Sequence, residues 1–237
     1  MKIIHFETID STNLYLKNHY QELDNLTFVS ADYQTNGKGR NERKWLSEKG
    51  DNLLFSLLIK DKKIIDEVNT LSLVAAISIS QTLEDILNIK DVYIKWPNDI
   101  FIKGKKVCGI LLEGQIPEYV VVGIGLNVNQ KMFEGEYNHE PTSLYLELGN
   151  NVDISKLKQD LLDYLIKNIN KISESKSHFY DYFVKHNYLK DKEISFVYNG
   201  KKMNGKVSDI DKDFRLVVDT TEGIMTLTSG EVSLLKI

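Results

Sequence analysis

The chain has 237 residues, enough for one large domain or for a large domain with a small second one. Its 42% hydrophobic and 27% charged residues are typical of a globular protein, and its net charge of −4 excludes a general attraction of the surface for polyanions. The single cysteine, Cys108, excludes an internal disulfide, and no apolar run approaches the roughly 18 residues of a membrane span. The N-terminus turns polar too early for a signal peptide, so we expect a cytoplasmic protein.

The first elements are predicted from apolar spacing. The apolar run at residues 3–6 predicts a strand, and residues 10–12 (Asp-Ser-Thr) then offer side chains that cap a helix. Residues 26–33 and 52–59 predict two more strands, and the second is apolar enough to be central in a sheet. The helical spacing of apolar residues over 64–87 predicts one long helix.

The rest of the chain alternates strands and helices and then changes character. Strands at 97–102 and 106–114 flank a Lys-Gly-Lys turn and predict a hairpin. The remaining predicted elements are strands at 91–96 and 119–129 and helices at 154–172 and 177–186. From residue 188 onward, short alternating strands are separated by Asn-Gly, Asp-Lys-Asp and Glu-Gly turns. We therefore predict an α+β main domain at 1–187, with a mixed sheet, and a small β-barrel-like module at 188–237.

A basic loop at residues 37–45 is the first candidate for chemistry. Two glycines allow close approach of the backbone to a ligand, and bidentate arginines suit carboxylate or phosphate oxygens. A solvated, flexible loop is an equally consistent interpretation of this segment alone. A nucleic-acid patch is poorly supported, because clustered aromatic residues are lacking. The loop contains only one acid, Glu42, and four cations: Lys38, Arg40, Arg43 and Lys44.

Two further segments carry lysines beside turns or strands. In the segment 95–99 (Lys-Trp-Pro-Asn-Asp), Pro97 ends a strand's hydrogen-bond ladder, and the Asn-Asp pair after a proline commonly forms an ordinary turn. A buried Lys95 would be costly unless Asp99 or a ligand oxyanion paired with it. Lys106, at the start of an apolar strand, is either a solvated edge charge or a residue that faces the same pocket as the basic loop.

Glycines within the strand at 119–129 indicate close approach of another backbone or a ligand. Asn127 and Asn129 alternate onto one side and can hydrogen-bond a nucleotide, although a bulge with capped turns fits equally well. Cys108 is predicted to be a small buried hydrophobe. The five histidines are scattered and no HExxH or GxSxG pattern occurs, so we predict no metal site built from side chains and no serine acyl-enzyme.

The order of these segments resembles one family. Ser-Thr-Asn at 11–13, Gln34 with the GKGR loop, KWPND at 95–99, KVCGIL at 106–111 and GIGLNVN at 123–129 together resemble the biotin protein ligases. GKVSDID and SGEVSLL near the C-terminus resemble the small SH3-like domain of those enzymes. The resemblance covers nearly the whole chain. It implies a class II synthetase-like catalytic domain of the biotin–lipoate ligase type, followed by an SH3-like β-barrel.

The resemblance also implies roles for individual residues. Arg40 and Lys106 would be catalytic. The family's loop is often GRGRRGR, and here Lys38 and Asn41 replace two of its arginines, so Lys38 keeps the charge but loses the planar fork. The residues implied to contact biotin are Ser11, Thr12, Asn13, Gln34, Lys38, Gly39, Arg40 and Lys106. Those implied to contact ATP or the adenylate are Arg43, Trp45, Lys95, Asn98 and Asn127.

The activity implied is that of a biotin–[acetyl-CoA-carboxylase] ligase. Such an enzyme activates biotin with ATP to biotinyl-5′-AMP and transfers it to a lysine of a biotin carboxyl carrier domain, with Mg²⁺ held through the ATP phosphates. Because the Ser-Thr-Asn segment begins at Ser11, we expect no N-terminal DNA-binding domain, and neither a DNA nor a membrane partner. The sequence does not decide between a monomer and a homodimer. The alternatives are a lipoate ligase or octanoyl transferase, and a biotin-binding module without catalysis.

Overall fold

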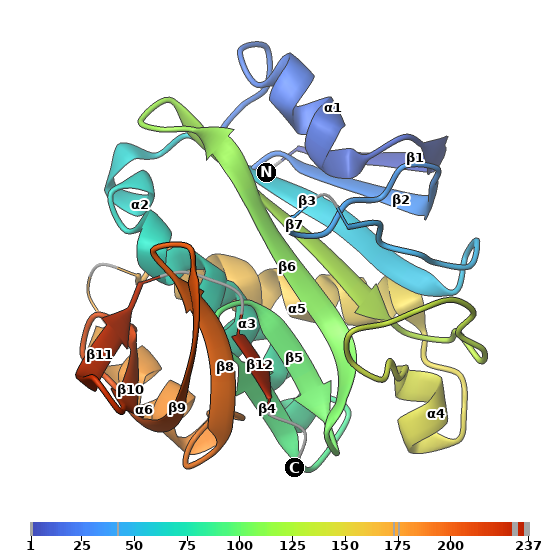
Figure 1. Cartoon of the computed structure of the whole chain (residues 1–237). Coiled ribbons are helices and arrows are strands. Elements are labelled where there is room, and N and C mark those ends of the chain that lie inside the picture. The colour runs from blue at the N-terminus through green and yellow to red at the C-terminus, as the bar shows by residue number, and fades with distance from the viewer. Residues whose placement is uncertain (1, 42, 173, 175, 229–231, 235–237) are drawn as a thin grey trace.

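A mixed seven-stranded sheet forms the centre of the protein (Figure 1). The computed structural model describes residues 2–41, 43–172, 174, 176–228 and 232–234. The sheet has the order β1-β2-β3-β7-β6-β5-β4, in which β1 and β2 are parallel and the other neighbours antiparallel. Its strands are β1 (Ile3–Ile9), β2 (Phe28–Gln34), β3 (Asn52–Ile59), β4 (Val92–Lys95), β5 (Asp99–Ile102), β6 (Lys105–Gln115) and β7 (Tyr119–Asn127).

Helices cover both faces of this sheet. Helix α1 (Thr12–His19) begins at the predicted cap, where the Ser11 hydroxyl accepts from the backbone N–H of Leu14, and its Leu16 packs against β2 and β3. Helices α3 (Val68–Asp85) and α5 (Ile154–Ile169) lie against the opposite face. Every residue of β3 is buried because both of its faces are covered, which confirms it as a central strand. The shorter helices are α2 (Lys62–Ile65), α4 (Leu144–Leu148) and α6 (Lys176–His186).

The prediction of one helix over 64–87 was wrong. The Asp61 carboxylate caps the Lys63 N–H at 2.8 Å and starts α2 two residues before the apolar pattern begins. At Glu67 the backbone leaves the helical conformation (φ −101°, ψ 21°), and α3 starts anew at Val68. Apolar spacing runs through this break because both helices turn apolar residues to the same core.

The predicted hairpin after the KWPND segment is confirmed as β5–β6. Lys103 and Gly104 both have positive φ, 49° and 83°, which is the backbone twist that a two-residue turn between antiparallel strands requires. The register shifts by a bulge between Ile100 and Phe101. Such a bulge bends the strand and re-aims the side chains near it.

The C-terminal segment forms a five-stranded antiparallel sheet of order β11-β10-β9-β8-β12, which confirms the predicted β-rich module. The indole N–H of the buried Trp96 donates to the Phe214 carbonyl at 3.0 Å, and the Tyr188 N–H donates to the Ile94 carbonyl at 2.9 Å. One apolar core runs through both sheets. The strands are β8 (Glu193–Tyr198), β9 (Lys201–Ile210), β10 (Leu216–Thr220), β11 (Gly223–Leu227) and β12 (Val232–Leu234).

Among the residues described, none of the helices combines the length and the apolar character needed to span a membrane. The mixed sheet with helices on both faces confirms the predicted α+β class. The boundary between residues 187 and 188 stays a prediction. It falls just before Tyr188, whose N–H bonds to β4, and ahead of the start of β8 at Glu193.

Truncation after Asn187 tests this boundary. All seven strands of the large sheet lie before it, so we expect the shortened chain to fold. The loss of Phe214 and its neighbours uncovers Trp96 and Tyr180, so we expect a lower midpoint of thermal unfolding, by several degrees or more. Circular dichroism with a melting curve measures both. A chain without cooperative unfolding would show that the two parts form one folding unit.

Candidate active site

A cavity of about 540 Å³ opens between the large sheet and two loops, residues 35–51 and 128–143. All of the residues that the family resemblance assigned to biotin or ATP line it: Ser11, Thr12, Asn13, Gln34, Lys38, Gly39, Arg40, Arg43, Trp45, Lys95, Asn98, Lys106 and Asn127. These residues come from α1, the end of β2, the basic loop, the β4–β5 turn, β6 and β7. The structure therefore brings together segments that are more than a hundred residues apart.

One end of the cavity is polar and uncharged. The backbone N–H of Thr12 donates to the Gln34 side-chain oxygen at 2.7 Å, and this bond joins the start of α1 to the end of β2. The Thr12 hydroxyl lies 2.6 Å from that of Ser56, and the Ser56 hydroxyl donates to the Asn13 side-chain oxygen at 2.5 Å. Ser11, Thr12 and Asn13 are all buried, so their hydrogen bonds fix the wall of the cavity here.

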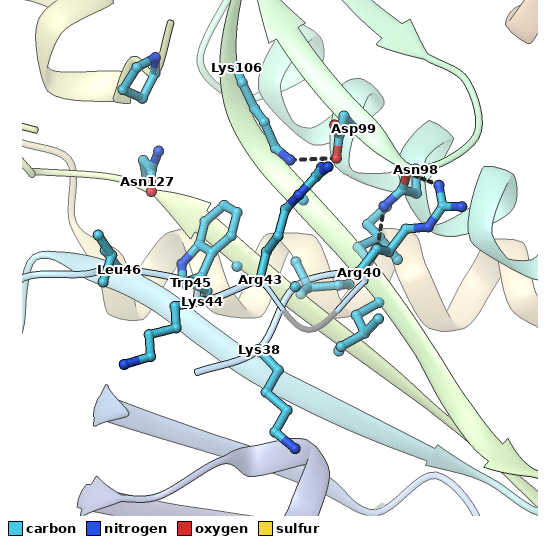
Figure 2. Close-up of a pocket in the computed structure, with 18 of the residues that line it drawn as sticks. Lys38, Arg40, Arg43, Lys44, Trp45, Leu46, Asn98, Asp99, Lys106 and Asn127 are labelled. Atoms are coloured by element: carbon cyan, nitrogen blue, oxygen red, sulfur yellow. Dashed lines mark hydrogen bonds and ion pairs between the residues drawn. The ribbon is translucent and has the colours of Figure 1, made fainter. Parts of the chain in front are cut away.

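The opposite end is cationic. The Lys106 amine lies 2.7 Å from the Asp99 carboxylate, and Arg40 Nη1 donates to the Asn98 side-chain oxygen at 3.1 Å (Figure 2). Asn98 Nδ2 in turn donates to the Ile110 carbonyl at 2.7 Å, which fixes the orientation of its amide. Arg40 is thus held by Asn98 of the β4–β5 turn, and Lys106 by Asp99 at the start of β5.

The glycine at 109 allows this arrangement. A Cβ at Gly109 would lie 3.3 Å from the Lys106 amine and 2.9 Å from the Trp45 ring, and a Cβ at Gly125 would lie 2.5 Å from the same ring. Trp45 therefore packs on the bare backbone of β6 and β7, and the Lys106 side chain extends along β6 toward Gly109, whose partner on β5 is Asp99. The prediction that glycines in the strand at 119–129 mark a close approach is confirmed at Gly125 for this indole.

The basic loop is folded, not open. Lys38 and Lys44 form an antiparallel bridge, Gly39 N–H donates to the Arg43 carbonyl at 2.7 Å, and Trp45 N–H donates to the Gly37 carbonyl at 2.9 Å. Figure 2 shows Arg43 extending toward Lys106 and Asp99, whereas Lys38 and Lys44 point away from that pair. The loop thus presents only part of its positive charge to the cationic end.

Two uncharged polar groups that line the cavity lack a hydrogen-bond partner among the described residues: the Trp45 indole N–H and the Asn127 side-chain oxygen. Asn127 is 4% exposed, and its Nδ2 donates to the Thr142 carbonyl at 3.0 Å. The Asn127 Oδ1 on the other side of the amide therefore points away from Thr142. A buried donor and a buried acceptor of this kind cost free energy unless a ligand or water satisfies them. Lys95, 5% exposed, lies on the same wall.

Of the two interpretations of Asn127 and Asn129, the capped turn applies to Asn129, which does not line the cavity. The Asn129 side chain bonds both backbone groups of Val152, donating to its carbonyl at 3.0 Å and accepting from its N–H at 2.9 Å. Strand β7 ends at Asn127, so the two-residue alternation no longer holds beyond it. Cys108 is fully buried, and burial raises the pKa of its thiol, so the neutral thiol is favoured. This confirms the prediction that Cys108 is a small buried hydrophobe.

The 128–143 loop was missed by sequence reasoning. With the Asn138 amide turned so that its oxygen faces Arg43, that oxygen accepts from Arg43 Nη1 at 2.8 Å and from Nη2 at 3.1 Å. These hydrogen bonds join the basic loop to the 128–143 loop beside the cavity. His139 lies edge-on to Phe101 with ring centroids 5.3 Å apart. Burial and the positive charge of Lys95 lower the pKa of His139 from 6.5 to about 4. The segment has no apolar period or motif that could have signalled these contacts.

Comparison with known proteins agrees with this geometry. Residues 5–129 match the biotin/lipoate A/B protein ligase family, and residues 191–235 match the biotin protein ligase C terminal domain. A solved structure of biotin protein ligase from Aquifex aeolicus in complex with biotin and ATP has a TM-score of 0.89 at 32% identity, with 100% of this chain and 99% of that chain covered. The chain therefore belongs to the biotin/lipoate A/B protein ligase family.

Two curated relatives narrow the comparison. The bifunctional ligase/repressor BirA of Bacillus subtilis is 33% identical over 225 residues, which cover 88% of this chain and 66% of that protein. The biotin--[acetyl-CoA-carboxylase] ligase of Mycobacterium tuberculosis is 27% identical over 219 residues, which cover 89% of this chain and 79% of that protein. The chain thus spans just under two thirds of the Bacillus relative.

His139→Asn tests the electrostatics of the cavity. The unfolded chain takes up a proton on this ring near pH 6.5, whereas the folded chain does so only near pH 4, so stability falls as the pH drops between these values. We expect the drop in the free energy of unfolding from pH 7 to pH 5 to be about 1–2 kcal/mol smaller in the variant than in the wild type. This is less than the full pKa shift implies, because the ring is partly exposed. Urea unfolding at pH 5 and pH 7 measures it. An equal pH dependence in both proteins would contradict the assignment.

Proposed function

We propose that this chain activates biotin with ATP to biotinyl-5′-AMP and transfers the biotinyl group to the ε-amine of a lysine on a biotin carboxyl carrier domain. The observation that carries the proposal is one cavity that joins an uncharged polar end, at Thr12, Asn13 and Gln34, to a cationic end, at Arg40 and Lys106. Biotin has the same division, with a neutral urea ring and a carboxylate at the end of an alkyl chain.

The first step places two anions side by side. A carboxylate oxygen of biotin attacks the α-phosphorus of ATP, a new P–O bond forms, and the bond to pyrophosphate breaks. Repulsion between the carboxylate and the phosphates is offset by the Lys106 ammonium and the Arg40 guanidinium, which are already held in place by Asp99 and Asn98. Charges fixed before the reaction avoid reorganisation during it, and this is the main source of rate in such sites.

Mg²⁺ fits this site as a partner of ATP. The described residues contain no group of three or more histidine, cysteine or acidic side chains that could hold a metal, so phosphate oxygens and water must supply most of its ligands. Asp99 is the carboxylate beside the cationic end. When bound, Mg²⁺ neutralises phosphate charge and favours departure of pyrophosphate.

The nucleotide side is inferred from the unsatisfied groups. The Trp45 indole N–H and the Asn127 side-chain oxygen offer one donor and one acceptor, the pairing that a nucleotide's base or sugar edge can satisfy. Lys95 lies on the same wall and adds positive charge for the phosphates. This supports the assignment of Arg43, Trp45, Lys95, Asn98 and Asn127 to ATP and the adenylate.

The two loops protect the intermediate. A mixed anhydride of a carboxylic acid and a phosphate hydrolyses readily, so water must be kept away until the acceptor arrives. The bonds from Arg43 to Asn138 hold the basic loop against the 128–143 loop and narrow the opening of the cavity. Opening and closing of such loops is a common way to sequester a reaction.

The second step uses the carrier lysine as nucleophile. Its amine attacks the acyl carbon, an amide bond forms, and AMP leaves as the bond between the acyl carbon and the phosphate oxygen breaks. With an ordinary pKa near 10.4, only about 0.04% of such an amine is neutral at pH 7. Entry into a cavity that already holds Lys95 and Lys106 disfavours the ammonium form and so favours the reactive amine.

Exchange of labelled pyrophosphate into ATP tests the first step without a carrier. We expect exchange that depends on biotin, because the uncharged end of the cavity offers the amides of Asn13 and Gln34 to a urea ring. Lipoate and octanoate serve as parallel substrates, since the matched family includes ligases for lipoate. Exchange with one of these and not with biotin would move the chain to that branch. If folded protein with Mg²⁺ showed no exchange, the ligase activity would be excluded and a biotin-binding module without catalysis would be the remaining interpretation.

Arg40→Ala tests the role of the Arg40 guanidinium in the basic loop. Arg40 is partly exposed and lies in a loop, so we expect stability to change by less than about 1 kcal/mol. We expect biotinyl-5′-AMP to escape into solution at least tenfold faster, because the guanidinium no longer holds the anhydride end. Chromatography of released adenylate measures this. Lys49→Ala, which removes an exposed cation beyond the basic loop, is the control, and equal escape from both variants would contradict the role.

A further inference from the structure

A line of hydrogen bonds runs behind the uncharged end of the cavity. It begins at Gln34 and passes through Thr12, Ser56 and Asn13 to the Glu113 carboxylate, to which Asn13 Nδ2 donates at 2.8 Å. The Lys17 ammonium pairs with the other carboxylate oxygen of Glu113 at 2.5 Å. The line joins four elements of the fold, β2, α1, β3 and β6, and ends in an ion pair.

Counting protons gives this line a direction. Ser56 has one hydroxyl proton and donates it to the Asn13 oxygen, so the 2.6 Å contact between Thr12 and Ser56 uses the proton of Thr12. Thr12 Oγ1 also lies 3.0 Å from Gln34 Oε1, but its single proton is used toward Ser56, so Gln34 Oε1 accepts from the Thr12 backbone N–H at 2.7 Å. Each side-chain donor therefore points from Thr12 toward Asn13, and the Asn13 N–H points on to Glu113.

Glu113 is the group that fixes this direction. An ionised carboxylate only accepts hydrogen bonds, so the side chain that faces it must present an N–H. Burial opposes the charge on Glu113, but the hydrogen bonds from Lys17 and Asn13 outweigh it and lower the pKa of the carboxyl. The charge is therefore present throughout the neutral pH range.

The amide of Asn13 has no room to turn otherwise. A Cβ at Gly123 would overlap the Asn13 side-chain oxygen, so the side chain lies directly on the backbone of β7. Asn13 is 5% exposed and uses one N–H for Glu113 and one lone pair for Ser56. One N–H and one lone pair remain, on a residue that lines the cavity.

We propose that Glu113, held in place by Lys17, is a positioning residue that sets the amide orientation of Asn13 and thereby makes this end of the cavity selective for a urea ring. A urea offers N–H donors beside a carbonyl acceptor, which is the complement of an amide held in one orientation. An acid with a purely apolar tail gains nothing from that orientation. Neither Glu113 nor Lys17 lines the cavity, so both act through Asn13. The inference rests on the proposed function, because it assigns the urea of biotin to this end.

Glu113→Gln is the direct test, because it keeps the shape and removes the charge that enforces the orientation. In biotin-dependent pyrophosphate exchange we expect KM for biotin to rise about tenfold, the loss of roughly one hydrogen bond, while KM for ATP and kcat change less than about threefold. The ratio of kcat/KM for biotin over octanoate should fall by a similar factor. Glu113→Asp should recover part of the biotin KM.

Glu118→Gln is the matched control, because Glu118 is an exposed acid just past the end of β6 that bonds Tyr20 and Gln115. It should leave both KM values unchanged. If Glu113→Gln fails to fold, Lys17→Met should still raise KM for biotin, about threefold, through loss of the group that holds the carboxylate. Unchanged KM for biotin in these variants, beside an active wild type, would overturn this inference alone. A wild type without biotin-dependent exchange would overturn the proposed function as well.

Discussion

The cavity confines several cations within one small space, and the neighbouring side chains are arranged to compensate their positive charge. Arg40, Lys95 and Lys106 line a volume of about 540 Å³, where like charges repel and burial of each is costly. The Asp99 carboxylate lies 2.7 Å from Lys106, and Asn98 supplies an amide oxygen for Arg40. Phosphates and a carboxylate that enter the cavity therefore bring negative charge to a place where positive charge is already concentrated.

The neighbouring residues fit this electrostatic demand. His139 stays neutral well below its usual pH, so it does not add another positive charge to the cavity. Arg43 is held by Asn138 on the facing loop, so binding of an anion and closure of the loops involve the same part of the chain. The cationic end thus links charge neutralisation to the exclusion of water, as activation of an acid as an anhydride requires.

Much of this could be predicted from the sequence, for physical reasons. The central strand β3, the β5–β6 hairpin and the cap at Ser11 follow from apolar runs, a turn with positive φ and a short polar side chain. The predicted site residues meet in one cavity because their motifs fall at strand ends and turns on the same side of the sheet. The split between α2 and α3 was missed, because a cap at Asp61 and a change of backbone at Glu67 leave no mark on apolar spacing.

The features that stayed hidden depend on contacts far apart in sequence. The pairing of Arg43 with Asn138 joins two loops without periodic pattern, and each residue taken alone is an ordinary polar residue. The line from Gln34 to Glu113 joins four elements, and Glu113 looks like an ordinary solvated acid at the end of an apolar strand. The glycine at 125 was expected to mark a close approach, but only the fold shows that Trp45 makes it and that Gly109 shares the contact.

The most direct test of the proposed ligase activity is the intact mass of a biotin carboxyl carrier domain after incubation with this chain, ATP, Mg²⁺ and biotin. We predict a gain of one biotinyl group on a single lysine, which requires both ATP and biotin and is abolished when that lysine is replaced by arginine. Lipoate or octanoate in place of biotin should give no gain. An unmodified carrier, or a carrier modified with one of these other acids in preference to biotin, would contradict the proposed activity.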